Sequence, residues 1–117
     1  MDLNSLFAGF NSKKVIVVGD AMIDAYMWGE INRMSPESPV PVVEVKKHET
    51  RLGGAANVAL NLQSLGATPI LCSVIGNDSQ SVFFEELMQD AGLTTKGLLT
   101  SNEKRTTVKT RVIANNK

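Results

Sequence analysis

The sequence has few residues that could crosslink the chain or bind a metal ion. Among its 117 residues there is one cysteine, Cys72, and one histidine, His48. A single cysteine cannot form an internal disulfide, and the chain has no Cys/His cluster with the spacing of metal ligands. We therefore expect a reducing, cytoplasmic compartment and no metal ligand in this chain, with Cys72 in a structural role.

An excess of charge of one sign and a long apolar run are also missing. Twelve Lys and Arg residues balance twelve Asp and Glu, which excludes a general polyanion binder and argues against a nucleic-acid partner. The densest apolar run, Val15–Val18, is far shorter than the ~20 residues that span a bilayer. The N-terminus lacks the basic and apolar regions of a secretory signal. We therefore expect no membrane partner. A function that depends on charge would have to use a local cluster, such as residues 94–117, where six Lys and Arg residues accompany a single acidic residue, Glu103.

The overall composition is that of a folded protein. Apolar residues make up 43% of the chain and charged residues 21%, close to the averages for soluble globular proteins and far from those of disordered chains. Single domains usually contain ~100 to 200 residues. The chain therefore holds one compact domain at most.

Periodic apolar residues predict helices that alternate with buried strands. The helical spacings cover residues 3–10, 55–65 and 79–91, and the strand-like runs cover residues 15–18 and 67–75. Asp78 is placed to cap one helix, and Gly66 and Gly92 to end two of them. This order predicts right-handed β-α-β units, hence an α/β fold with a parallel sheet. We expect the first strand to be central and covered on both faces, and the first helix to pack on the rest.

Two other segments have the pattern of edge strands. Three prolines between residues 36 and 41 exclude a helix, and Val42–Lys47 after them predicts an exposed or edge strand. Residues 106–114 alternate so that Lys and Arg share one face of a strand. We expect residues 29–51 to form an excursion from the main sheet.

Two carboxylates follow the first predicted strand. Asp20 and Asp24 come after its carboxyl end, where ligands of open α/β sheets usually bind. A carboxylate there can accept hydrogen bonds from sugar hydroxyls. For either residue alone, a turn cap or a solvated side chain is the favoured explanation. Their joint placement after a buried strand makes a binding role equally plausible.

A Gly-Gly pair opens the second predicted helix. Gly53 and Gly54 lack Cβ atoms, so a ligand could approach the backbone and receive hydrogen bonds from the free amides of the helix start. Asn57, one turn into the helix, can both donate and accept hydrogen bonds. A Gly-Gly pair before a helix is more often a simple loop. The segment is neither a dinucleotide fingerprint nor a P-loop.

The remaining candidates are cationic or aromatic. Lys109 and Arg111 lie two residues apart on a predicted strand and could bind a phosphate, although spacing alone favours an ordinary solvated edge. Tyr26 and Trp28 could shield a sugar face, or belong to the core. His48 has no partner pattern and is expected to be exposed.

The segment Gly53–Ala59, followed by Gly66 and Gly76 at the spacing found here, resembles the N-terminal signature of the ribokinase-like (PfkB) carbohydrate kinases. Three further stretches, Val17–Asp24, Arg33–Val43 and Thr106–Ala114, are similar to the D-glycero-beta-D-manno-heptose 7-phosphate kinase branch of that family. The resemblance covers nearly all of this chain but only the N-terminal part of such a kinase.

The resemblance implies a Rossmann-like α/β domain with a small β-sheet lid, and makes residues 1–117 a partial ribokinase-like domain. Its lid strands would lie at about residues 30–50 and 105–114. In this family the sugar binds between lid and domain, and the lid often serves as the dimer interface. We therefore expect a homodimer formed through the lid.

The resemblance also implies roles for individual residues. Asp24, Gly53, Gly54 and Asn57 would contact sugar hydroxyls. It also favours Lys109 and Arg111 as ligands of the substrate phosphate, although their spacing alone favours a solvated strand edge.

One part of the family pattern is missing from this sequence. Family kinases carry a C-terminal Gly-Ala-Gly-Asp type motif, which supplies the catalytic base and an anion hole, and a downstream nucleotide-binding segment. Here no glycine follows Gly97 and no aspartate follows Asp90. We expect no catalytic residue and no bound cofactor in this chain alone, which is interpreted as a fragment of a longer kinase.

The full-length parent would use ATP and Mg²⁺ to phosphorylate the anomeric hydroxyl of D-glycero-D-manno-heptose 7-phosphate, on the route through ADP-heptose to lipopolysaccharide core. Two alternatives remain open. One is a fragment of another PfkB-type sugar kinase, and the other is a short non-catalytic module that binds a sugar phosphate or dimerises.

Overall fold

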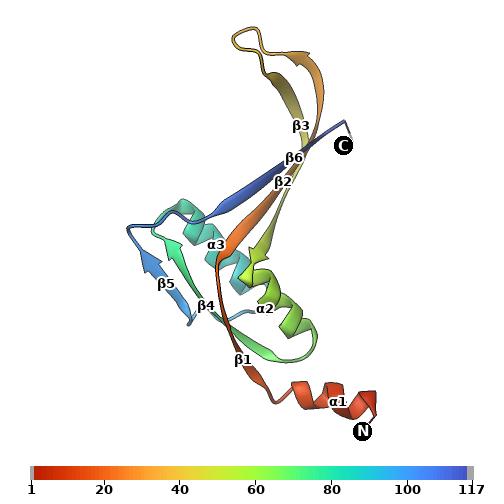
Figure 1. Ribbon diagram of the computed structural model, residues 1–117, viewed down its shortest axis with the longest axis vertical. Coiled ribbons are helices and arrows are strands. Elements are labelled where there is room, and N and C mark those ends of the chain that lie inside the picture. The colour runs from red at the N-terminus through yellow and green to blue at the C-terminus, as the bar shows by residue number, and fades with distance from the viewer. Residues whose placement is uncertain (1, 116–117) are drawn as a thin grey trace.

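Two separate three-stranded sheets organise the chain. The computed structural model (Figure 1) describes residues 2–115 and has extents of 63 × 39 × 20 Å. Its radius of gyration is 18.4 Å, whereas a compact chain of this length would have about 13 Å. The excess arises because one sheet projects away from the α/β body.

The first sheet is parallel and has the strand order β1-β4-β5. Its strands are β1 (Lys14–Val18), β4 (Thr68–Gly76) and β5 (Leu98–Ser101). The predicted α/β fold with a parallel sheet is therefore confirmed. The short strand β5 was not predicted from the sequence.

Two helices, α2 (Ala55–Ser64) and α3 (Ser79–Asp90), follow strands β3 and β4, as Figure 1 shows. Phe84 and Met88 of α3 are fully buried against Leu71 and Ile75 of β4. The predicted cap residues hold: Asp78 forms a capping box, while Gly66 and Gly92 adopt φ of 104° and 76° after the two helices. Only glycine takes these angles without strain.

The expectation that the first strand is central and covered on both faces is not met in the described part of the chain. β1 lies at the edge of its sheet, next to β4. Ile16 and Val18 are 64% and 80% exposed. The helices cover the other face, so an apolar sheet surface remains open to solvent.

The second sheet has the order β3-β2-β6 and combines an antiparallel hairpin with a parallel third strand. Its strands are β2 (Ala21–Met34), β3 (Pro41–Gly54) and β6 (Val108–Ala114). Strand β2 was missed in the sequence because its buried positions include the small residues Ala21 and Ala25, which hide the alternation. The sheet begins at Ala21 rather than near residue 30.

Helix α1 (Leu3–Phe10) forms where its apolar spacing predicts, and Asp2 caps it by accepting a hydrogen bond from the Ser5 backbone N–H at 2.7 Å. None of its residues is buried, and Leu3 is 70% exposed. Within residues 2–115, the expectation that this helix packs on the rest of the chain is met only at its C-terminal end, where the half-buried Phe10 lines a pocket with Leu62 and Leu65. No helix in this range has the length and apolar character needed to cross a membrane.

Candidate functional site

Asp24 and Gly53 meet at the base of the projecting sheet. Asp24 lies within β2, not in the loop after β1 where we expected it, because β1 ends at Val18 and the chain re-enters a strand at Ala21. A Cβ atom on Gly53 would lie 2.6 Å from Asp24 Oδ2. The absence of a side chain on Gly53 thus leaves room for the Asp24 carboxylate.

Gly54 turns the chain from β3 into α2. Its φ of 61° is in the left-handed region, and a Cβ there would collide with the Asp20 carbonyl oxygen. The same oxygen accepts a hydrogen bond from the Ala55 N–H at 2.8 Å. Asp20 is exposed, and it shapes the site through its backbone carbonyl. Position 54 requires glycine because other residues rarely adopt this backbone conformation.

The Asp24 carboxylate is only partly paired. Its side chain is 21% exposed, and Oδ1 lies 3.6 Å from Arg111 Nη1. This oxygen is buried and has no hydrogen-bond partner within residues 2–115. Buried polar atoms are nearly always hydrogen-bonded, so the carboxylate has an acceptor position left for a ligand.

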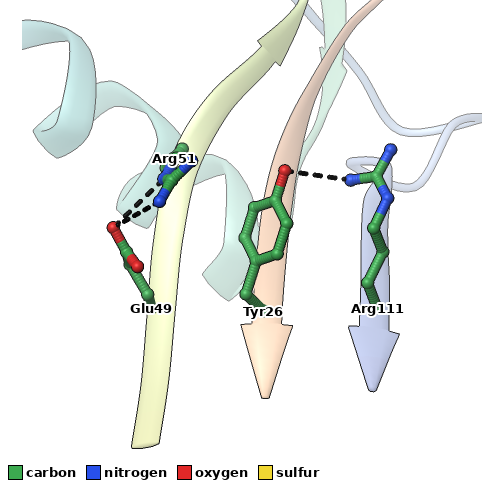
Figure 2. A network of polar contacts seen from close by, with 4 residues as sticks. All are labelled: Tyr26, Glu49, Arg51 and Arg111. Atoms are coloured by element: carbon green, nitrogen blue, oxygen red, sulfur yellow. Dashed lines mark hydrogen bonds and ion pairs between the residues drawn. The ribbon is translucent and has the colours of Figure 1, made fainter. Parts of the chain in front are cut away.

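The two basic residues of β6 lie beside β2. The parallel register pairs Lys109 with Asp24 and Arg111 with Tyr26, so both cations share the face of Asp24. Arg111 Nη1 donates a hydrogen bond to the Tyr26 hydroxyl at 3.2 Å (Figure 2). Lys109 is exposed and forms no ion pair in the described part of the chain. The predicted basic face of this strand is confirmed.

Aromatic and basic side chains continue this face along β2 and β3. The rings of Tyr26 and Trp28 stack with centroids 5.6 Å apart. Arg51 lies 4.8 Å from the Tyr26 centroid, and Lys47 lies 4.8 Å from that of Trp28. Sequence reasoning missed Arg51, although its position two residues before Gly53 on a strand places both on one face.

Asn57 lies in the first turn of α2, four residues beyond Gly53. Its side chain is exposed and makes no hydrogen bond to any described residue. The helix start has amides without intrahelical partners. A shared ligand contact of Asp24 and Asn57 stays a prediction.

The opposite face of the projecting sheet has a different chemistry. A cavity of about 520 Å³ lies between this face and α3, and no Lys, Arg, Asp or Glu lines it. The exposed His48 is on this side, together with Thr50 and Thr110. Only the Asp24 face offers both a carboxylate and cations. No group of three or more His, Cys, Asp or Glu suited to a metal ion occurs among residues 2–115.

Asp78 fixes the start of β6 relative to the body. Its Oδ2 accepts a hydrogen bond from the Thr106 N–H at 2.9 Å, and the Thr106 hydroxyl accepts one from the Gly76 N–H at 3.0 Å. The contacts with Thr106, and then that with the Ser81 backbone, lower the pKa of Asp78 below its usual 3.8. This network anchors the chain just before Lys109 and Arg111.

Comparisons with known proteins agree with this fold. The profile of pfkB family carbohydrate kinases matches residues 12–117. The Bifunctional protein HldE of Helicobacter pylori (strain J99) is 50% identical over 104 residues, which are 89% of this chain and 22% of that protein. The chain therefore spans less than a quarter of the length of this relative.

Two solved structures show the same fold at lower sequence identity. A carbohydrate kinase from Agrobacterium tumefaciens aligns with a TM-score of 0.67 and 24% identity, over 89% of this chain and 32% of that one. A ribokinase from Cryptococcus neoformans in complex with ADP aligns with a TM-score of 0.64 and 22% identity, over 90% and 32%. From the family profile and the ribokinase-like α/β architecture together, we conclude that this chain belongs to the pfkB family of carbohydrate kinases.

Proposed function

We propose that this chain is the N-terminal, sugar-binding portion of an ATP-dependent kinase that phosphorylates D-glycero-D-manno-heptose 7-phosphate at the anomeric hydroxyl. Such a kinase acts in ADP-heptose and lipopolysaccharide core biosynthesis. The family assignment and the similarity to HldE proteins support a sugar kinase. The choice of a heptose phosphate rests on the three additional sequence stretches that resemble the heptose 7-phosphate kinase branch.

The observation that carries this proposal is the unpartnered carboxylate of Asp24 above Gly53, with cations on the neighbouring strand. Oδ1 of Asp24 has no hydrogen-bond partner among residues 2–115, and a sugar hydroxyl is the kind of donor that would satisfy it. The missing Cβ atoms of Gly53 and Gly54 make room for the Asp24 carboxylate and the Asp20 carbonyl oxygen. Asn57 in the helix that follows can bind an adjacent hydroxyl.

The phosphate end of the substrate is assigned to β6. Arg111 lies opposite Tyr26, two positions along β2 from Asp24, and its Nη1 comes within 3.6 Å of Asp24 Oδ1, so hydroxyl and phosphate contacts would lie side by side on one face. Arg binds phosphate through paired N–H donors, and Lys acts as a point charge. Lys109 and Arg111 can therefore recognise the 7-phosphate while Asp24 holds the sugar.

ATP and Mg²⁺ are proposed as cosubstrate and cofactor of the full-length parent. Mg²⁺ would neutralise the charge that develops on the transferred phosphoryl group. The residues of this chain bind and orient the acceptor sugar, and we assign none of them as the catalytic base.

We also propose that the parent is a homodimer formed through the projecting sheet, which would act as the lid. β3 and β6 are edge strands, and Val45 and Val112 are 44% and 52% exposed. Edge strands and exposed apolar side chains favour association with another chain.

The test is ATP-dependent phosphorylation by the full-length parent, measured with heptose 7-phosphate, ribose and fructose. Turnover of heptose 7-phosphate well above the other sugars supports the proposal. Turnover of another sugar alone would indicate a different PfkB-type kinase. Sugar-phosphate binding without turnover would favour a non-catalytic module.

A further inference from the structure

The face that carries Asp24 contains a third cation beside the two on β6. Arg51 lies directly opposite Asp24 in the antiparallel register of β2 and β3. The Asp24 carboxylate occupies the space that a Cβ atom would take on Gly53, two residues further along β3. Arg51 therefore borders the same carboxylate from the side of β2 opposite to β6.

Arg51 and Arg111 are held on the two sides of one aromatic ring. The guanidinium carbons lie 4.8 Å and 5.4 Å from the Tyr26 centroid, and Figure 2 shows the ring between the two side chains. The Tyr26 hydroxyl accepts a hydrogen bond from Arg111. The ring thus fixes the spacing of two positive groups that come from the two strands on either side of β2, although they lie far apart in the sequence.

We propose that Arg51 and Arg111 form a two-arginine clamp for the phosphate group of the sugar phosphate, with Tyr26 as the positioning residue between them. This inference rests on the proposed function and deepens it. It makes Arg51, which belongs to β3, a specificity-determining residue for a phosphorylated over an unphosphorylated sugar.

Both guanidinium groups have donors to spare. Arg51 uses Nε and Nη2 on a single oxygen, Glu49 Oε1, at 3.1 Å and 3.0 Å. Arg111 uses Nη1 on Tyr26 and lies at the same time near Asp24. An arginine carries more N–H donors than these contacts occupy, so each group can still bind a phosphate oxygen.

The charges of this face also fit an incoming phosphate. Around Asp24 and Tyr26, three cations (Arg51, Lys109 and Arg111) stand against Glu49 and Asp24, which leaves an excess of positive charge. Two cations over one ring repel each other. A phosphate dianion that receives hydrogen bonds from both guanidinium groups beyond the edge of the ring would offset this repulsion, and Arg is well suited to this recognition.

A solvated ion pair between Arg51 and Glu49 is the ordinary alternative, because such surface pairs contribute little to stability. The chain contains a matched example in Lys46 and Glu44, which also lie two residues apart on β3 and are bonded at 2.9 Å. No aromatic ring lies under Lys46 among the described residues. Lys46→Gln is therefore the control for Arg51→Gln.

The experiment measures binding to the full-length parent by calorimetry, with heptose 7-phosphate, unphosphorylated heptose and inorganic phosphate as separate ligands. For Arg51→Gln we expect a Kd for heptose 7-phosphate that is roughly tenfold to a hundredfold higher, with the Kd for unphosphorylated heptose unchanged. Lys46→Gln should bind both sugars like the wild type. Arg51→Lys should lie between wild type and Arg51→Gln, since Lys keeps the charge but loses the paired donors.

Equal binding of heptose 7-phosphate by Arg51→Gln and Lys46→Gln would overturn the clamp. An equal loss of affinity for both heptoses would also overturn the clamp, because Arg51 would then shape the site without recognising the phosphate. If the wild type binds neither heptose, the substrate proposal fails by itself. Inorganic phosphate then decides the clamp: weaker binding by Arg51→Gln than by wild type upholds it, and equal binding refutes it.

Discussion

The carboxylate of Asp24 fills the space that a side chain on Gly53 would need, since a Cβ there would lie 2.6 Å from Oδ2. Gly53→Ala should therefore rotate Asp24 away from its position and weaken sugar binding by the parent kinase about tenfold. The change in melting temperature should be small, because only one carboxylate has to move. Calorimetric titration with the sugar and a thermal melt check both expectations.

Gly9→Ala is the matched control, because a Cβ at Gly9 meets nothing within 4 Å. Its sugar affinity should equal that of the wild type. A Gly53→Ala protein with unchanged affinity would show that Asp24 adapts freely, or that it does not hold the ligand.

Removal of the carboxylate itself should be more severe. Asp24→Ala in the parent should cost about 1.5 to 3 kcal/mol of sugar binding, the scale of a hydrogen bond to a charged group, and leave ATP affinity largely unchanged. Asp90→Ala, an exposed aspartate at the end of α3, serves as the control. Sugar binding as tight as that of the wild type in a folded Asp24→Ala protein would remove Asp24 from the site.

The lowered pKa of Asp78 predicts that the folded chain loses stability in acid. Its pKa is lowered in the folded chain by the contacts from Thr106 and Ser81, so its charged form stabilises the fold above the unfolded value of 3.8. This contribution is lost as the pH falls through the lower folded pKa. Asp78→Asn keeps a capping side chain but removes the charge.

Melting temperatures of the wild type and Asp78→Asn, measured from pH 6 down to pH 2, test this. The wild type should melt at a higher temperature than Asp78→Asn at pH 6, and the two curves should converge as the pH falls below 3.8. A difference that stays constant over the whole range would assign the effect to hydrogen-bond geometry and not to the charge.

The projecting sheet should mediate dimer formation. Val112→Asp places a charge on an exposed apolar position of β6 and should weaken the dimer at least about tenfold, because an unpaired charge is costly to bury. Val58→Asp, at a 48% exposed position on α2, should leave it intact. Light scattering over a concentration series compares them, and a wild-type parent that is monomeric at high concentration would refute the lid dimer.

The 117-residue chain alone should not phosphorylate a sugar. A general base and groups that stabilise the transferred phosphoryl group each contribute orders of magnitude to the rate, and the Gly-Ala-Gly-Asp type motif that supplies them in this family does not occur in its sequence. The assay compares purified chain with a no-protein control. ATP-dependent turnover of heptose 7-phosphate above that control would contradict this prediction.

Local signals in the sequence were sufficient for the two helices and for strands β1 and β4 of the α/β body, but not for β5. The helices at residues 55–64 and 79–90 formed where apolar spacing and caps placed them, since caps and glycine C-termini act through neighbouring residues only. Strand β2 escaped detection because two of its buried positions, Ala21 and Ala25, are small, while large side chains such as Tyr26 and Trp28 lie on the other face. Its identity as a strand is set by its pairing partners.

The sequence by itself supplied the candidate residues for binding a sugar phosphate: Asp24, the Gly53-Gly54 pair, Asn57, and Lys109 and Arg111 two residues apart on a strand. Only the tertiary structure decided how they meet. The register of β3 and β6 against β2 brings Arg51 and Arg111 to opposite sides of Tyr26. That arrangement depends on pairings between segments far apart in the chain, and period-two alternation fixes the face of a residue but not its neighbours across the sheet.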